Sequence, residues 1–325
     1  MRAKGTFYKA ALLLTAHCSL LATLASSIHA ATNTGASFLR IDTGARPAAL
    51  GGAYTAIADD VNAMYYNPGG LASLKLREVG ATHAQWLLGS TFDFFGYAQP
   101  TSLGTFGLGM TRLGYGSTDG RDASRQASSG FSATDTAYSV GFSRTLGGVG
   151  IGWLDSGKTG VGMNVKWLQS SIGQYSASAL AFDLGATHRL SGLPLSFGAS
   201  VLNLGQGMKF LDQTDPLPLT VSLGSSWRVA GVMSLALDVR REVYDQRTAV
   251  GVGTEYAVLS GLSLRAGYAS QLAQAARGAK VGGVSMLGGL SGGIGLKFSK
   301  YRADYTFAPF GELGNVQRLS LGARF

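Results

Sequence analysis

Few side chains in this sequence could support catalysis or bind a metal. Outside the first 30 residues the histidines are His83 and His188, which lie far apart, with no cysteine or third histidine at ligand spacing. Residues 289–293 match the Gly-x-Ser-x-Gly pattern of a serine nucleophile, but that chemistry needs a strand-to-helix turn and this segment is typical of a Gly- and Ser-rich strand. Asp59 and Asp60 are adjacent but lack the further spaced acids of a calcium loop. We therefore predict no catalytic site, no metal site and no cofactor, and a protein that is not an enzyme.

The first 30 residues have the features of a secretory signal peptide. Three basic residues precede an apolar stretch over residues 10–24, which is too short to span a bilayer, and Ala30 offers a small residue at a cleavage point. The single cysteine, Cys18, lies in this stretch in a poor context for lipoprotein processing. We predict residues 1–30 to be a signal peptide that is cleaved near Ala30.

The composition argues against both a soluble globule and a helical membrane protein. Glycine accounts for 48 of the 325 residues, 46% of residues are hydrophobic and only 14% are charged, which is few charges for a water-exposed surface of this size. The longest uncharged stretches are interrupted by glycine, proline and polar residues. The net charge of +9 is scattered along the chain, so we expect no nucleic-acid partner.

From residue 76 onward, apolar residues alternate with small, polar or charged residues. In residues 235–240, for example, Leu, Leu and Val alternate with Ala, Asp and Arg. A period of two sends the two sets to opposite faces of a strand. Because the second set is mainly Gly, Ala, Ser and Thr with isolated charges, we predict that the apolar face contacts lipid and the other face lines a lumen.

This pattern predicts an all-β fold, a transmembrane antiparallel β-barrel of about fourteen strands over residues 76–325. We expect external loops at Gly116–Gly130 and Gln271–Lys280. The terminal Phe325, after alternating apolar residues, resembles the C-terminal signal by which outer-membrane barrels are recognised for insertion. The expected strands cover residues 76–88, 91–99, 105–113, 134–146, 161–172, 176–189, 194–204, 217–228, 232–242, 248–258, 261–270, 290–298, 301–308 and 316–325.

Recurrent Gly-x-Gly pairs lie within these strands. None of them opens a helix of the dinucleotide-binding type, so we do not expect a nucleotide site. Two glycines spaced by two share one face of a strand, where they allow curvature or the close approach of other backbone.

Residues 31–75 lack the alternation, and we predict that they form a plug inside the lumen. Asp59 is a candidate cap for a short helix through Met64–Tyr66. Asn67 is a candidate cap for a second turn that has Pro68 at its first position. Such turns are too short to be stable alone, so the lumen wall must support them.

The segment LGGAYTAIADDVNAMYYNPGGLASL, residues 50–74, resembles the N-terminal hatch of the FadL-like outer-membrane proteins, and most closely their PorV/PorQ (UPF0164) branch. The resemblance implies a fourteen-stranded barrel with an N-terminal hatch in the lumen. Where the family pattern has Asn-Pro-Ala, this chain has glycine at position 69, which we expect to loosen the turn without removing the cap. Further matches lie at residues 181–185, 203–205, 216–218, 304–305 and 309–314.

Two groups of residues are therefore candidates for the functional site. The hatch or gate group is Asn67, Pro68, Gly69, Asp59 and Asp60. The second group occupies positions predicted to face the lumen, where we expect pairs within the wall and anchors for the hatch; it consists of Asp183, Asp238, Arg240, Arg265, Arg302 and Asp304.

The resemblance also carries the functional expectation. It implies passive transport of hydrophobic compounds, such as fatty acids, across the outer membrane of a Gram-negative type of cell. The alternative is a PorV-like barrel that binds secreted proteins in type IX secretion and surface attachment. The expected partners are outer-membrane lipids and a hydrophobic small molecule, with secreted proteins under the alternative. Type IX machinery in the source genome would favour the alternative.

Overall fold

A computed structural model describes residues 33–121, 126–147, 157–271, 288–310 and 314–325. The predicted signal peptide and its cleavage point lie outside the described residues, as does the predicted loop after Gln271. Within the described part of the chain, no helix is both long and apolar enough to cross a membrane.

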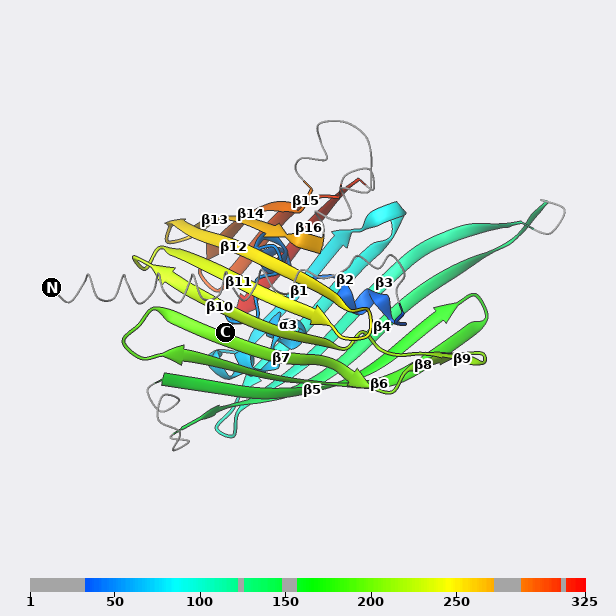
Figure 1. The fold of residues 1–325 in the computed structure, drawn as a ribbon. Coiled ribbons are helices and arrows are strands. Elements are labelled where there is room, and N and C mark those ends of the chain that lie inside the picture. The colour runs from blue at the N-terminus through cyan, green and yellow to red at the C-terminus, as the bar shows by residue number, and fades with distance from the viewer. Residues whose placement is uncertain (1–32, 122–125, 148–156, 272–287, 311–313) are drawn as a thin grey trace.

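Fourteen strands form a closed antiparallel barrel, in which the first strand pairs with the last (Figure 1). Each of the fourteen predicted strands is confirmed. A separate two-stranded hairpin that the sequence did not reveal, β8 (Met208–Phe210) with β9 (Gln213–Asp215), lies in the connection after β7. The barrel strands are β1 (Glu78–Gln85), β2 (Thr91–Pro100), β3 (Thr105–Arg121), β4 (Ala127–Leu146), β5 (Gly157–Ile172), β6 (Tyr175–Leu190), β7 (Leu195–Gly205), β10 (Thr220–Val229), β11 (Met233–Glu242), β12 (Arg247–Leu259), β13 (Leu262–Ala269), β14 (Leu290–Phe298), β15 (Tyr301–Pro309) and β16 (Asn315–Arg324).

The two faces of the barrel wall differ as the alternation predicts. In β16 the outward-facing Leu321 is 57% exposed, whereas Ser320 and Arg318 are buried. In β11 the outward Leu235 is exposed, whereas Ala236 and Asp238 are buried. Apolar side chains outside and small or charged ones inside are the pattern of a transmembrane barrel.

The two ends of the barrel differ in the length of their connections. At the end that holds the start of β1 and the end of β16, turns such as residues 101–104 and 191–194 are short, and we name it the short-turn end. The opposite, long-loop end carries the β8–β9 hairpin and the connection between β13 and β14. In bacterial barrels short turns face the periplasm and longer loops face the outside.

The predicted external loop at Gly116–Gly130 is wrong in extent. β3 continues to Arg121 and β4 begins at Ala127, so most of that segment is strand (Figure 1). The backbone ladder between the two strands does not depend on apolar side chains, and the Ser- and Asp-containing sequence suits strands that extend beyond lipid into water.

Residues 33–75, which we call the hatch, lie inside the barrel (Figure 1). The hatch contains η1 (Ser37–Arg40), α2 (Ala45–Ala49), α3 (Ala63–Tyr66) and η2 (Pro68–Ser73), while η3 (Leu87–Gly89) lies between β1 and β2. None of these helices exceeds two turns, a length that is unstable in isolation. Burial against the barrel wall stabilises these short helices, and the hatch residues Tyr54, Phe38 and Met64 are fully or almost fully buried.

Candidate functional site

The hatch meets the barrel wall where the wall has glycine. A Cβ at Gly160 of β5 would lie 2.5 Å from the carbonyl oxygen of Gly69, and one at Gly162 would lie 2.5 Å from the backbone of Pro68. These distances are too short for any side chain. The Gly-x-Gly pair therefore allows hatch backbone to lie directly against strand backbone, which is one of the two roles that the sequence allowed.

Asn67 both caps a turn and joins the hatch to the wall. Its Oδ1 accepts a hydrogen bond from the backbone N–H of Gly69 at 3.1 Å, and Pro68 occupies the first helical position of η2. Its Nδ2 donates to the carbonyl oxygens of Thr55 in the hatch, at 2.8 Å, and Ala186 in β6, at 2.9 Å. The predicted cap is present, and the contact with β6 is one that the local sequence could not indicate.

Gly69 has a different physical role from the one expected. A Cβ at this position would lie 2.7 Å from the carbonyl oxygen of Gly185 and 2.8 Å from the Cα of Ala186. Glycine is required here because the hatch backbone lies between β5 and β6, rather than because the turn is loose.

Asp60 links the hatch to the opposite side of the barrel. One of its carboxylate oxygens lies 2.9 Å from Nη2 of Arg302 on β15, and the other accepts the backbone N–H of Asn62 at 2.9 Å. Burial opposes ionisation of Asp60, but the positive charges of Arg302 and Arg46 outweigh it and lower the pKa of this carboxyl group to about 2. Asp60 is thus a buried anion held by arginines.

Asp59 is not the helix cap that the sequence predicted. The N-cap position of α3 is Asn62, and it has no side-chain cap. Asp59 instead accepts a hydrogen bond from Nη1 of Arg46 at 2.5 Å, since the adjacent Asp60 supplies the acceptor at the start of the helix. The ion pair with Arg46, which lies 13 residues earlier in the chain, determines the position of the Asp59 carboxylate in place of helix capping.

A chain of alternating charges continues from Arg46 along the wall. Nε of Arg46 lies 2.8 Å from Glu255 of β12, and Glu255 also binds Arg265 of β13 at 2.5 Å. Arg265 lies 2.7 Å from Asp304 of β15, which in turn lies 2.9 Å from Arg302. The predicted wall residues Arg265, Arg302 and Asp304 are therefore brought together.

Asp238 and Arg240 of β11 both bind the hatch. Oδ2 of Asp238 accepts the backbone N–H groups of Tyr54 at 2.9 Å and Thr55 at 2.7 Å. Arg240 pairs with Asp42 of the hatch at 2.9 Å. These two residues lie where the anchor hypothesis expects them.

Asp183 belongs to a separate cluster within the wall. It lies 2.8 Å from Nζ of Lys166 and accepts the backbone N–H of Asn203 at 2.8 Å. Asn203 has φ of 63° and donates through Nδ2 to the carbonyl oxygen of Pro218 at 3.1 Å. The cluster thus joins three sequence motifs, around residues 183, 203 and 218, at a bulge between β6 and β7.

Sequence reasoning missed several members of these networks. Arg46 lies in the distinctive hatch segment, next to Pro47, and its charge was the available signal. Glu255 and Glu78 occupy inward positions of their strands, so the alternation of apolar and polar residues was the available signal for them. Nothing in the local sequence indicated which hatch residue each would meet.

Towards the long-loop end the lumen is filled by apolar side chains. Phe38 and Leu39 of the hatch pack there against wall residues such as Phe92 and Leu168. The β8–β9 hairpin and the segment after it add Met208 and Leu217. The complete buried cluster is Phe38, Leu39, Ala84, Phe92, Leu113, Ala137, Leu168, Ala177, Ala181, Met208 and Leu217, which we call the apolar plug.

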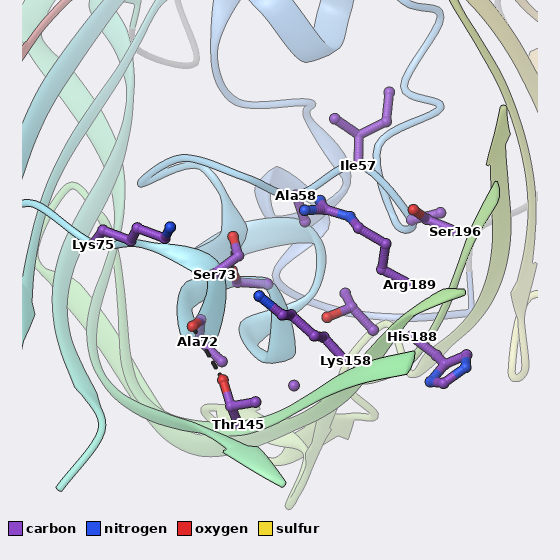
Figure 2. A pocket seen from close by; sticks show the side chains of 14 residues that line it. Ile57, Ala58, Ala72, Ser73, Lys75, Thr145, Lys158, His188, Arg189 and Ser196 are labelled. Atoms are coloured by element: carbon purple, nitrogen blue, oxygen red, sulfur yellow. Dashed lines mark hydrogen bonds between the residues drawn. The ribbon is translucent and has the colours of Figure 1, made fainter. Parts of the chain in front are cut away.

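A cavity of about 340 Å³ lies at the short-turn end, between the hatch and the inner face of β4–β6 (Figure 2). The hatch contributes Ile57, Ala58 and Ser73, and the wall contributes Thr145 and Lys158, among others. The hydroxyl of Thr145 donates to the carbonyl oxygen of Ala72 at 3.3 Å, closing one side of the cavity. The apolar plug and this cavity therefore occupy opposite ends of the lumen.

His83 and His188 lie on different strands and do not form a common site. His83 faces outward and lies 2.7 Å from Asp93, and both side chains are about half exposed. Nδ1 of His188 lies 2.9 Å from the hydroxyl of Thr159. Among the residues that the structure describes, no group of three or more His, Cys, Asp or Glu could hold a metal ion.

Comparison with known proteins identifies related sequences and folds. The model of the family described as uncharacterised protein family UPF0164 matches residues 18–199. No curated protein matches the sequence. Many solved structures share the fold, and three of them are described next. The toluene transporter TodX of P. putida has a TM-score of 0.59 at 13% identity, over 87% of this chain and 98% of that chain. The monoaromatic hydrocarbon channel CymD has a TM-score of 0.57 at 12% identity, over 87% and 97%. The toluene transporter TbuX of Ralstonia pickettii has a TM-score of 0.55 at 14% identity, over 87% and 98%.

Proposed function

Because the chain belongs to the UPF0164 family and forms a closed barrel with an internal hatch, we propose that it is an outer-membrane channel for the passive passage of hydrophobic small molecules. The class includes fatty acids, which the FadL-like resemblance implies, and monoaromatic hydrocarbons, which TodX and CymD carry according to their descriptions. The proposal includes residence in the outer membrane after removal of residues 1–30.

The apolar plug is the observation that carries this proposal. Water-filled porins have polar interiors. Here the inward-facing Phe92 and Leu168 are fully buried against Phe38 of the hatch. Apolar side chains on the inner face of a barrel favour a solute that itself prefers an apolar environment. Such a solute entering from the long-loop end would displace contacts within the apolar plug.

The hatch residues would act as the gate under this proposal. Asn67, Pro68 and Gly69 pack directly against β5 and β6, and Asp60 is held by Arg302. Passage past the hatch requires some of these contacts to open, so weakening them is expected to alter both leak and uptake. Asp59, through Arg46, belongs to the same gate.

Uptake of labelled oleate and toluene in cells that lack their own hydrophobic-compound channel tests the proposal. Wild-type protein should restore uptake, and the double variant Phe92→Gln/Leu168→Gln should restore much less, since both side chains belong to the apolar plug. Leu211→Gln, in the exposed turn between β8 and β9, is the matched control. Uptake no greater than that of cells without the barrel, from wild-type protein that fractionates with the outer membrane, would refute transport.

The PorV-like role in type IX secretion stays a prediction. Its test is the capture of secreted cargo proteins by the purified barrel, in a cell that encodes type IX machinery. Binding of cargo without any effect on hydrophobic uptake would favour this alternative over the channel.

A further inference from the structure

The cavity at the short-turn end carries three positive charges. Lys75 follows the last turn of the hatch, Lys158 lies on β5 and Arg189 lies on β6, and all three line the cavity. Figure 2 shows Lys158 and Arg189 pointing into the cavity, whereas the ring of His188 points away from it. Among the residues that the structure describes, no acidic side chain lines the cavity.

Lys158 and Arg189 are direct cross-strand partners. Like charges directly opposite each other on one face of a sheet destabilise it, so an anion bound between these two side chains would offset their repulsion. Neither residue, nor Lys75, forms an ion pair with an acidic side chain in the described ranges. Four arginines of the networks between the hatch and the wall differ in this respect, because each has a carboxylate partner: Arg46, Arg240, Arg265 and Arg302.

The rest of the lining has a different chemistry. Ile57, Ala58 and Ala72 present apolar surface beside the charges, and Ser196 adds a hydroxyl from β7. A volume of about 340 Å³ lies in the range of small-molecule sites, roughly 300–1,000 Å³. A ligand that matches both parts has an anionic head and a short apolar body.

We propose that this cavity is a binding site for the carboxylate of a small amphipathic molecule. The planar guanidinium of Arg189 matches a carboxylate through two parallel hydrogen bonds, and Lys158 and Lys75 add point charges on either side. The apolar body lies against Ile57 and Ala72. A bound carboxylate would also relieve the repulsion between Lys158 and Arg189.

Binding to the purified full-length barrel in detergent tests this assignment with four probes. Octanoate has both head and apolar body, acetate has only the head, octanol has only the body, and inorganic phosphate is a different anion. Calorimetry should give the tightest binding for octanoate. The double variant Lys158→Gln/Arg189→Gln should lower octanoate affinity about tenfold or more, because it removes two of the charged hydrogen-bond donors to the carboxylate.

Lys300→Gln is the control, since it removes a positive charge at the same end of the barrel from a turn outside the cavity. It should leave octanoate affinity unchanged. A photoreactive octanoate analogue should label β5 or β6 in wild-type protein, which maps the site without any substitution and covers the case of a double variant that folds poorly. Heat-modifiable migration on gels reports folding.

Four results would overturn the assignment. They are equal octanoate affinity in the double variant, octanol binding as tight as octanoate, acetate or phosphate binding as tight as octanoate, and labelling confined to other strands. Binding is measured on purified protein without any transport step, so a failure of uptake in cells would refute the proposed channel and leave this site standing.

Discussion

A carboxylate oxygen of Asp60 in the hatch lies 2.9 Å from the guanidinium of Arg302 on β15. Arg302 also lies 2.9 Å from Asp304 and 3.5 Å from Glu78, so one wall arginine holds the hatch and two wall acids together. The hatch and the barrel are thus joined by buried ion pairs as well as by close backbone packing.

Removing the charge of Asp60 should loosen the hatch while leaving the barrel closed. Breaking a buried ion pair by removing one partner costs about 3–5 kcal/mol of stability. Because Arg302 keeps two other carboxylate partners, we expect Asp60→Asn to destabilise the hatch by an amount near the lower end of this range. Planar-bilayer conductance should rise. Asp93→Asn is the matched control, because this carboxylate is 46% exposed and pairs with the outward-facing His83, outside the hatch contacts. An equal or larger effect from Asp93→Asn would contradict the role given to Asp60.

Ionisation of Asp60 should make the association of the hatch with the barrel wall depend on pH. Burial alone would raise the pKa of Asp60, but Arg302 and Arg46 lower it from its ordinary value of 3.8 to about 2. A lowered pKa means that the ionised form stabilises the folded state above the ordinary value and that this stabilisation is lost as the pH falls from about 4 to about 2. Proteolysis of the hatch should therefore increase across this interval. Asp60→Asn should flatten the dependence, and an identical pH profile in the variant would exclude Asp60 as its source.

Asn67→Ala should destabilise the hatch by more than the loss of a helix cap alone. A cap contributes roughly 1 kcal/mol. The substitution also leaves the buried carbonyl groups of Thr55 and Ala186 without this donor, at about 1–3 kcal/mol for an unsatisfied group. Hydrogen exchange of the hatch amides measures the effect, with Asn315→Ala at the exposed start of β16 as the control. Equal protection in both variants would mean that Asn67 does not hold the hatch.

Gly69→Ala restores the residue of the family pattern and should nevertheless destabilise this protein. The added methyl group would lie 2.7 Å from the carbonyl oxygen of Gly185, and overpacking of this kind costs typically about 1–3 kcal/mol. The melting temperature of the hatch should fall relative to Gly147→Ala, a position with no atom within 4 Å of the new Cβ. If the alanine variant is as stable as wild type, β5 and β6 must be able to move apart.

Val140→Arg should impair insertion because Val140 faces outward from β4, where that strand pairs with both β3 and β5, and is 59% exposed on the barrel surface. An arginine on the lipid face costs about 2–4 kcal/mol near the bilayer midplane. Leu211→Arg, which is 71% exposed at the turn between β8 and β9, should have little effect. Folding yield into liposomes provides the comparison, and equal yields would contradict the assigned lipid face.

The strand pattern was largely determined by local sequence. Alternation with a period of two marked each barrel strand and separated outward residues such as Leu321 from inward ones such as Ser320, because successive side chains of a strand point to opposite faces. The Asn67–Pro68 turn was predictable for a similar reason, since the cap and the proline act within three residues. The Gly-x-Gly pairs indicated either strand curvature or the close approach of other backbone, but not which backbone approaches.

The tertiary structure decided which residues meet across the lumen. The local sequence offered Asp59 as a helix cap, but Asp59 binds Arg46 instead. Asp60 lies near Arg46 and also binds Arg302, because barrel closure sets β15 beside the middle of the hatch. Likewise, Lys158 and Arg189 become neighbours only through the register of β5 with β6. The sequence of a single strand determines which of its side chains share a face. The contacts between the strands and the hatch depend instead on the closed barrel, because the hatch has no stable structure outside it.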